Sequence, residues 1–156
     1  MATPANEATA ATQDPIPYQY FVLQAVPRPE RGECVNVAVV LYAEDSDVLA
    51  LAWEIDEARL LALDPDVDVD SVRGSLEFLK TWCDAPSHTI GRSEHRTPPV
   101  AGGPVPEARR PGARFGWLAA PRSTMLRPGP VHGGVSTNPR AEVARLMSVL
   151  VRPPRA

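Results

Sequence analysis

Lysine is almost absent from this 156-residue chain, since Lys80 stands alone against fifteen arginines. Alanine, valine and proline are abundant. We attribute this combination to a GC-rich genome, so a single arginine is weak evidence of function here. The two cysteines, Cys34 and Cys83, are too few for a framework of several disulfides and suit a reducing compartment.

Long apolar runs are also missing. No run approaches the ~18 residues of a membrane-spanning helix. Residues 1–15 lack the basic start and the apolar centre of a secretory signal. We therefore expect a cytoplasmic protein that does not associate with a membrane, and a length of 156 residues suits a single domain.

Charge is distributed unevenly along the chain. Residues 1–78 hold fifteen acids and four bases, whereas residues 79–156 hold four acids and twelve bases. This polarity has two readings. The two parts can attract each other within the fold, or the basic part can present a positive face to an anionic partner.

One domain is predicted over residues 17–152, between a disordered tail at 1–16 and a short tail at 153–156. A stretch rich in proline, glycine and arginine at about 84–113 interrupts this domain. Such a composition is typical of a disordered loop, because few of its side chains can join a core.

Aromatic and β-branched residues predict three strands in the first part of the domain, at 18–26, 35–43 and 48–55. The second run is apolar on both faces, which indicates a central strand covered on both sides. A short acidic turn separates it from the third run, which predicts a hairpin. Within the second run, strict alternation places Asn36 on the same face as Ala38 and Val40.

Helix signals follow. Asp56 precedes a short apolar segment at 57–63 that Pro65 ends, which predicts a capped helix. Apolar residues at steps of three and four then predict a helix up to about Trp82, with Cys83 facing the core. The acids of residues 64–70 lack the glycine and the final glutamate of a calcium loop, so we interpret them as complementing the dipole of that helix.

The second part of the domain resumes with a predicted strand at 114–122 and an extended segment at 123–135, which its prolines confine to a sheet edge. Asn138 and Pro139 open a last helix. The predicted order is β-β-β-α-α-loop-β-β-α. It indicates an α+β fold, in which three helices pack on a largely antiparallel sheet of about five strands.

Two segments carry a resemblance to a known family: YFVLQAVPRPERGECVNVAVVLY (20–42) and GWLAAPRSTMLRPGPVHGG (116–134). Together they resemble the bacterial domain-of-unknown-function family 3037, over about residues 18–83 and 114–152. The shared features are an Arg-x-Glu-Arg-Gly-Glu loop before an Asn-bearing strand, and a late Ala-Pro-Arg-Ser-Thr with a Val-His-x-Gly. Ala38 stands where the family pattern has glycine, and Arg127-Pro128-Gly129 replaces a more polar stretch.

The resemblance implies a small cytoplasmic bacterial protein without an assigned activity. It also implies a HipA-like kinase as a partner, because members of the family are sometimes encoded beside genes for such kinases. It supplies no mechanism.

The first candidate site is the charged loop before the second strand. Its members are Arg28, Glu30, Arg31, Glu33 and Asn36. Paired carboxylates can bind a metal or transfer protons, and guanidinium groups can clamp a phosphate or a carboxylate. The alternative is structural: the charges pair within the loop or face solvent, and Asn36 ties the loop down.

The second candidate site lies near the edge segment and consists of Arg122, Ser123, Thr124 and His132. An arginine with hydroxyl and backbone N–H groups could hold an anion, and His132 would serve an enzyme if it met Glu30 or Glu33. The alternative is a turn with a locally bonded hydroxyl and a capping histidine.

Two further sets carry less weight. Cys83, His88 and His95 have the spacing of no standard zinc site, and neither cysteine has an obvious base beside it, so no metal, no cofactor and no cysteine nucleophile are predicted. A basic set on the predicted loop could bind nucleic acid through phosphates, although no aromatic residues for base stacking accompany it. Its members are Arg92, Arg96, Arg109, Arg110 and Arg114.

The preferred interpretation is a non-catalytic protein-interaction or regulatory module, because the domain is small, strongly polarised in charge and free of catalytic motifs. The expected surface joins residues 28–36 with residues 122–132, and charge reversal at Arg28 and Arg31 should weaken partner binding. The alternatives are a small enzyme or phosphate-ligand binder that uses Glu30, Glu33, Arg122 and His132, and an arginine-mediated nucleic-acid binder.

Overall fold

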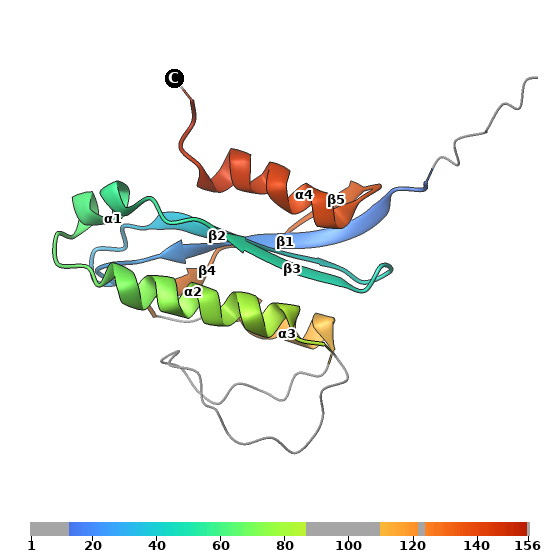
Figure 1. Ribbon diagram of the computed structural model, residues 1–156, viewed down its shortest axis with the longest axis horizontal. Helices are drawn as coiled ribbons and strands as arrows, with labels where there is room; N and C mark the ends of the chain where they lie inside the picture. The colour runs from blue at the N-terminus through green and yellow to red at the C-terminus, as the bar shows by residue number, and fades with distance from the viewer. Residues whose placement is uncertain (1–12, 87–109, 122–123, 156) are drawn as a thin grey trace, which may run out of the picture.

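The chain forms a sheet with helices on both faces (Figure 1). The computed structural model describes residues 13–86, 110–121 and 124–155. The α+β class, the antiparallel sheet and its five strands agree with the prediction. No helix in these described ranges is long and apolar enough to cross a bilayer.

All strand pairs are antiparallel, and the sheet order is β3-β2-β1-β4, with β5 also on β1. The strands are β1 (Ile16–Ala25), β2 (Val35–Ala43), β3 (Val48–Trp53), β4 (Leu126–Pro128) and β5 (His132–Ser136). The predicted hairpin of the second and third strands is confirmed, as is the central place of β2, where seven of nine residues are buried.

Strands β4 and β5 are two pieces of one irregular edge strand. β4 pairs with Leu23–Ala25 of β1, and β5 pairs with Ile16–Tyr20. Three residues, 129–131, stand opposite two residues of β1, so the edge strand bulges between its pieces. The prolines at 128 and 130 lack backbone donors, which confines this segment to an edge, as the sequence predicts.

The helices at 57–63, 69–84 and 139–146 lie close to the predicted residues, whereas a further helix at 111–119 was not among the three predicted. The helices are α1 (Glu57–Leu63), α2 (Val69–Asp84), α3 (Pro111–Ala119), α4 (Pro139–Leu146) and a π-helical last turn, η1 (Met147–Val151). The expected caps are present at Asp56 and Asn138, whose side chains each accept a backbone N–H.

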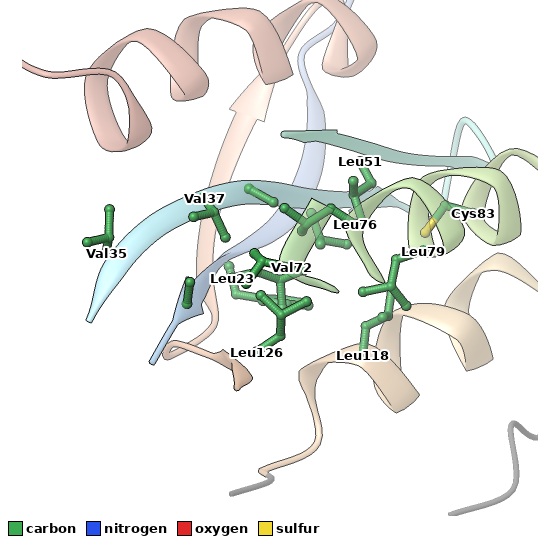
Figure 2. Packing of buried hydrophobic residues seen from close by; sticks show 14 of the residues in the cluster. Leu23, Val35, Val37, Leu51, Val72, Leu76, Leu79, Cys83, Leu118 and Leu126 are labelled. Carbon is green, nitrogen blue, oxygen red and sulfur yellow. The ribbon is translucent and has the colours of Figure 1, made fainter. Parts of the chain in front are cut away.

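Two cores flank the sheet. The larger core lies between the sheet and helices α2 and α3, where Val72, Leu76, Leu79 and Cys83 of α2 pack against Val37 and Leu51, among others (Figure 2). The smaller core lies under α4 and η1 and joins Val39 and Leu41 of β2 to Val143, Leu146, Met147 and Val151. We call these two sides of the sheet the α2 face and the α4 face.

A bulge in β2 overturns one expectation. The pairing with β1 shifts between Leu23 and Gln24, so Val37 is an extra residue on β2. The alternation of side chains breaks there. Asn36 therefore lies on the α4 face, whereas Ala38 and Val40 belong to the core on the α2 face. The sequence does not mark the bulge, because Val37 continues the apolar run.

The predicted strand at 114–122 is wrong, because Pro111–Ala119 is helix α3. Aromatic content favoured a strand, but Arg114, Phe115 and Leu118 are buried together at helical spacing. The predicted loop at about 84–113 loses both ends to α2 and α3, and residues 87–109 lie outside the described part. Ile16, which the prediction placed in the tail at 1–16, belongs to β1, and residues 1–12 lie outside the described part.

Candidate functional site

The charged loop after β1 is held by two ion pairs. Arg28 donates to Asp64, at the end of α1, with 3.0 Å between Nη2 and Oδ1. Arg31 makes a two-pronged contact with Glu33, at 2.7 and 3.0 Å. These bonds hold the pKa of both carboxyl groups below their usual values, chiefly through the arginine hydrogen bonds. The pair of Arg31 and Glu33 lies within the loop, as the structural alternative describes, whereas Arg28 pairs outside it with Asp64.

The two predicted clusters do not meet. Glu30 and Glu33 lie in the loop beyond the end of β1, whereas His132 pairs with Tyr20 in the middle of that strand. The five residue steps from Tyr20 to Ala25 alone span roughly 17 Å at a strand rise of ~3.3 Å. A site that joins these carboxylates directly to His132 is therefore not formed.

Asn36, the last member of the first cluster, belongs to a different constellation. Three neighbouring strands carry a row of polar side chains on the α4 face. Arg127 of β4 donates through Nε to Gln24 Oε1 at 3.2 Å, and Gln24 donates through Nε2 to Asn36 Oδ1 at 3.4 Å. Asn36 then donates through Nδ2 to the carbonyl of Leu150, at 2.9 Å. Asn36 thus ties down the last helical turn rather than its own loop.

The guanidinium of Arg127 is half-buried and has only neutral partners among the described residues. Besides Gln24, its Nη2 lies 3.6 Å from the Sγ of Cys34. The ion pairs of the described chain involve other bases, and no described carboxylate pairs with Arg127. A cation removed in part from water, with no counter-ion, is a natural position for an external anion.

Beside this row, the described residues cover the α4 face of the sheet only in part. Helices α4 and η1 pack over β2 and β3, and the even-numbered side chains of the middle of β1 remain half-exposed. The ring of Tyr20 lies 5.4 Å from that of His132, centroid to centroid. We call this surface the open strip, and its residues are Tyr20, Val22, Gln24, Arg127 and His132.

Of the second predicted cluster, only Thr124 and His132 lie among the described residues. Arg122 and Ser123 lie outside the described residues. Thr124 donates its hydroxyl to the carbonyl of Leu126 at 2.5 Å, which is the locally bonded hydroxyl of the structural alternative. His132 is exposed in β5 and stacks with Tyr20 rather than capping a helix.

A cavity of about 420 Å³ opens where α2 ends and α3 begins, and Cys83 and Arg140 line it. Its other bases are engaged, because Lys80 pairs with Asp84 at 2.6 Å and Arg114 donates to the carbonyls of Trp82 and Ala85. Burial raises the pKa of the Cys83 thiol to about 12, so this cysteine is a protonated core residue at neutral pH.

The two remaining candidate sets, the basic set and the set of Cys83 with two histidines, lie partly in this region of the chain. Arg114 belongs to α3 and is buried, so it does not share a flexible basic loop with Arg110. His88, His95, Arg92, Arg96 and Arg109 lie outside the described residues. Within the described ranges no group of three metal-ligating side chains is assembled.

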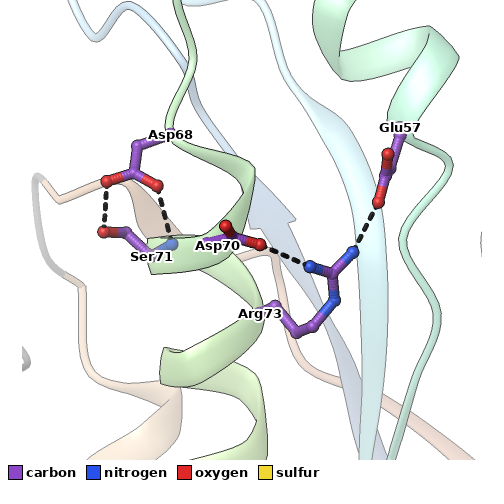
Figure 3. A network of polar contacts seen from close by, with 5 residues as sticks. All are labelled: Glu57, Asp68, Asp70, Ser71 and Arg73. Atoms are coloured by element: carbon purple, nitrogen blue, oxygen red, sulfur yellow. Dashed lines mark hydrogen bonds and ion pairs between the residues drawn. The ribbon is translucent and has the colours of Figure 1, made fainter.

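The acidic segment around α1 and α2 is a structural network (Figure 3). Asp68 caps α2 by accepting both the backbone N–H and the hydroxyl of Ser71. Arg73 bridges Asp70, one turn away, and Glu57 of α1. Asp68 and Asp70 thus lie at the N-terminus of α2, where acids complement the helix dipole, as the sequence predicts.

As individual site residues, four members of the open strip were not identified from the sequence, namely Tyr20, Val22, Gln24 and Arg127, although the expected surface at 122–132 includes Arg127. For Gln24 a signal was available, because a polar side chain inside an apolar strand must find hydrogen bonds. For Arg127 there was none, since only the pairing of β4 with β1 places it beside Gln24.

Comparison with known proteins gives one match. A family model described as "Protein of unknown function (DUF3037)" matches residues 20–151. Neither the curated proteins nor the solved structures give a match. The matched range includes the loop, the open strip and both helices of the α4 face, so every described candidate residue lies within it.

Proposed function

Because the chain belongs to the family of proteins of unknown function DUF3037, its activity has to be argued from its own geometry, and we propose that it is a non-catalytic protein-interaction module of the bacterial cytoplasm. The observation that supports this proposal is the open strip, with a half-buried arginine that has no counter-ion among the described residues. Tyrosine and arginine are the residue types that dominate binding energy in protein interfaces.

The strip is suited to binding because its backbone is fixed. Tyr20 and Gln24 lie on β1, and each is paired on both sides, with β2 on one side and with β5 or β4 on the other. Gln24, which itself donates to Asn36, accepts from Arg127 and holds that side chain from one side. A partner therefore meets ordered side chains and loses little entropy in ordering them.

The charged loop does not support the catalytic alternative. Its visible carboxylates are either paired with arginine, as in Glu33, or exposed, as in Glu30, and His132 is remote from both. The nucleic-acid alternative loses Arg114, which is buried. The nucleic-acid alternative remains an outcome of the test below.

The resemblance names a first partner to test, a HipA-like kinase from the same genome. The tagged full chain, the variant Arg127→Glu and the control variant Arg59→Glu are each incubated with the purified kinase, with and without nuclease. Arg59 is exposed on α1, outside the open strip. We expect a stoichiometric complex with the wild type and the control, at least tenfold weaker for Arg127→Glu, and insensitive to nuclease.

The same three proteins are also used to capture partners from a lysate of the host. Equal recovery of a partner by all three proteins would remove the open strip from the proposal. Recovery that disappears on nuclease treatment would favour the nucleic-acid alternative. No stoichiometric partner in either experiment would overturn the interaction module.

A further inference from the structure

The chemistry of the open strip selects among protein partners. Resting on the proposed function, we infer that the strip binds an extended acidic segment of its partner, with an Asp or Glu carboxylate on Arg127. The juxtaposition that carries the inference is a half-buried guanidinium, oriented by neutral groups, next to an aromatic and apolar surface.

Arg127 has more hydrogen-bond donors than its described partners use. A guanidinium has five N–H groups. Arg127 uses Nε for Gln24 and one Nη2 donor for the weak contact with Cys34. The remaining donors have no described protein acceptor. A carboxylate supplies two acceptor oxygens and the missing negative charge, and charge-assisted bonds of this kind are about twice as strong as neutral ones.

The charge of the open strip favours an acidic ligand. The open strip holds no acidic side chain, and Glu33, which precedes Cys34 in the chain, is paired with Arg31. Glu142 of α4 accepts from Tyr18 and pairs with Arg145, and Glu54 pairs with Arg152 on the β3 side. Arg127 is therefore the charged side chain of the strip that has no described counter-ion. An acidic segment is attracted, and a basic one is repelled.

The open strip suits a peptide better than a nucleic acid. A nucleic acid is held by several phosphate contacts along its backbone, and the strip offers one arginine. Its remaining surface is formed by Val22 and the Tyr20–His132 pair, and the exposed Val131 lies beside it. A peptide with apolar side chains near its carboxylate matches this mixture better than a phosphate backbone does.

The length of the open strip suits a short extended segment. The strip extends along β1 from Gln24, opposite Arg127, to Tyr20, opposite His132. Four residue steps correspond to roughly 13 Å at a strand rise of ~3.3 Å. An extended segment of about four or five residues therefore covers the strip, with the carboxylate at one end and an apolar residue at the other.

The test is a selection that does not depend on the host partner. A library of mRNA-displayed random dodecapeptides is selected on the immobilised full chain, on Arg127→Gln and on the control variant Arg59→Gln. We expect Asp and Glu to be enriched over Lys and Arg among peptides that bind the wild type and the control, and the enrichment to vanish for Arg127→Gln. A selected peptide should bind Arg127→Gln at least tenfold more weakly in fluorescence anisotropy.

A second variant guards against loss of folding. Gln24→Glu places a carboxylate of the chain itself beside Arg127, so it should suppress the acidic preference while the guanidinium stays in place. Circular dichroism and urea midpoints verify that the variants fold. Selection of neutral or basic peptides, no enriched peptide, or an acidic preference unchanged by both variants would overturn the inference.

The two proposals fail separately. A host partner that binds through Arg127 but contacts it with a neutral segment would leave the interaction module intact and overturn the acidic segment. Acidic peptides that depend on Arg127, without any host partner, would support the acidic segment as the ligand of the strip and count against the wider role.

Discussion

Asn36 in β2 donates its side-chain N–H to the carbonyl of Leu150 in η1, at 2.9 Å, across 114 residues of sequence. The carbonyls in the last turn of a helix have no partner within the helix. Here the sheet supplies one, and the same Asn36 accepts from Gln24, which in turn accepts from Arg127. The open strip and the end of the chain are therefore joined by hydrogen bonds.

Replacing Asn36 by alanine should destabilise the fold. The variant leaves the Leu150 carbonyl and the Gln24 amide without their partners, which we expect to lower the free energy of unfolding by about 1 to 2 kcal/mol. Urea titration of the two proteins measures this difference. The matched control is Thr81→Ala, whose hydroxyl only adds a bond to a carbonyl within α2, and its change should stay within about 0.5 kcal/mol. Equal effects of the two substitutions would contradict the role assigned to Asn36.

Gly134 in β5 is required by the ring of Tyr18. A Cβ atom at this position would lie 2.5 Å from the Cζ and the hydroxyl of Tyr18, which is buried and donates to Glu142 at 3.1 Å. We expect Gly134→Ala to cost about 1 to 3 kcal/mol, as overpacking does. Gly116→Ala is the control, because nothing lies within 4 Å of its Cβ, and it should be neutral or gain up to about 1 kcal/mol. Thermal unfolding followed by circular dichroism compares them, and a stable Gly134→Ala variant would show that the two strands separate easily.

The buried thiol of Cys83 should make the free energy of unfolding depend on pH in the alkaline range. Its pKa is about 12 in the folded protein, whereas an unfolded thiol ionises near ~8.5. Between these values the unfolded state releases a proton that the folded state keeps. The free energy of unfolding should therefore fall as pH rises through this window, by up to about 1.4 kcal/mol per pH unit. Urea titrations at pH 8 and pH 10 measure the slope.

The control for that slope is Cys83→Ala. This substitution alters stability at every pH through its smaller side chain, but it should remove part of the decrease between pH 8 and pH 10. A slope identical to that of the wild type would mean that other groups cause the decrease. Iodoacetamide gives an independent check, because the native protein should be alkylated at half-exposed Cys34 and not at buried Cys83.

Because Arg28 pairs with Asp64, reversing the charge of Arg28 should affect the stability of the fold. Asp64 is buried, and the Arg28 hydrogen bond is the main cause of its lowered pKa. Stability from this pair is present above the unfolded pKa of Asp, near ~3.9, and is lost as pH falls further. Arg28→Ala should therefore lower the urea midpoint at pH 7, by an amount that shrinks toward pH 3.

Arg31→Ala is the matched control for Arg28→Ala, because Arg31 pairs with the exposed Glu33. The urea midpoint of Arg31→Ala should hardly change, because ion pairs at the surface contribute little to stability. Reversal of Arg28 would place two carboxylates together at a buried site. The loss of partner binding that the sequence analysis expected from that change would then reflect folding rather than recognition. Equal midpoints for the two alanine variants would contradict the buried pair.

Local patterns in the sequence determined most of the secondary structure. The apolar run of β2, the caps Asp56 and Asn138, and the prolines of the edge strand each act through neighbouring residues, so they could be read directly. Helix α3 was missed because its apolar residues alternate and its periodicity is short, and only its packing against the larger core separates helix from strand there.

The candidate site depended on tertiary structure. The sequence alone identified a charged loop and a histidine, and strand pairing placed them far apart. The same pairing brought Arg127, Gln24 and Asn36 into one row, although 103 residues separate the first two. The bulge at Val37 decided which face Asn36 occupies. Register and bulges arise from contacts between distant strands, so no local pattern in this sequence could have set them.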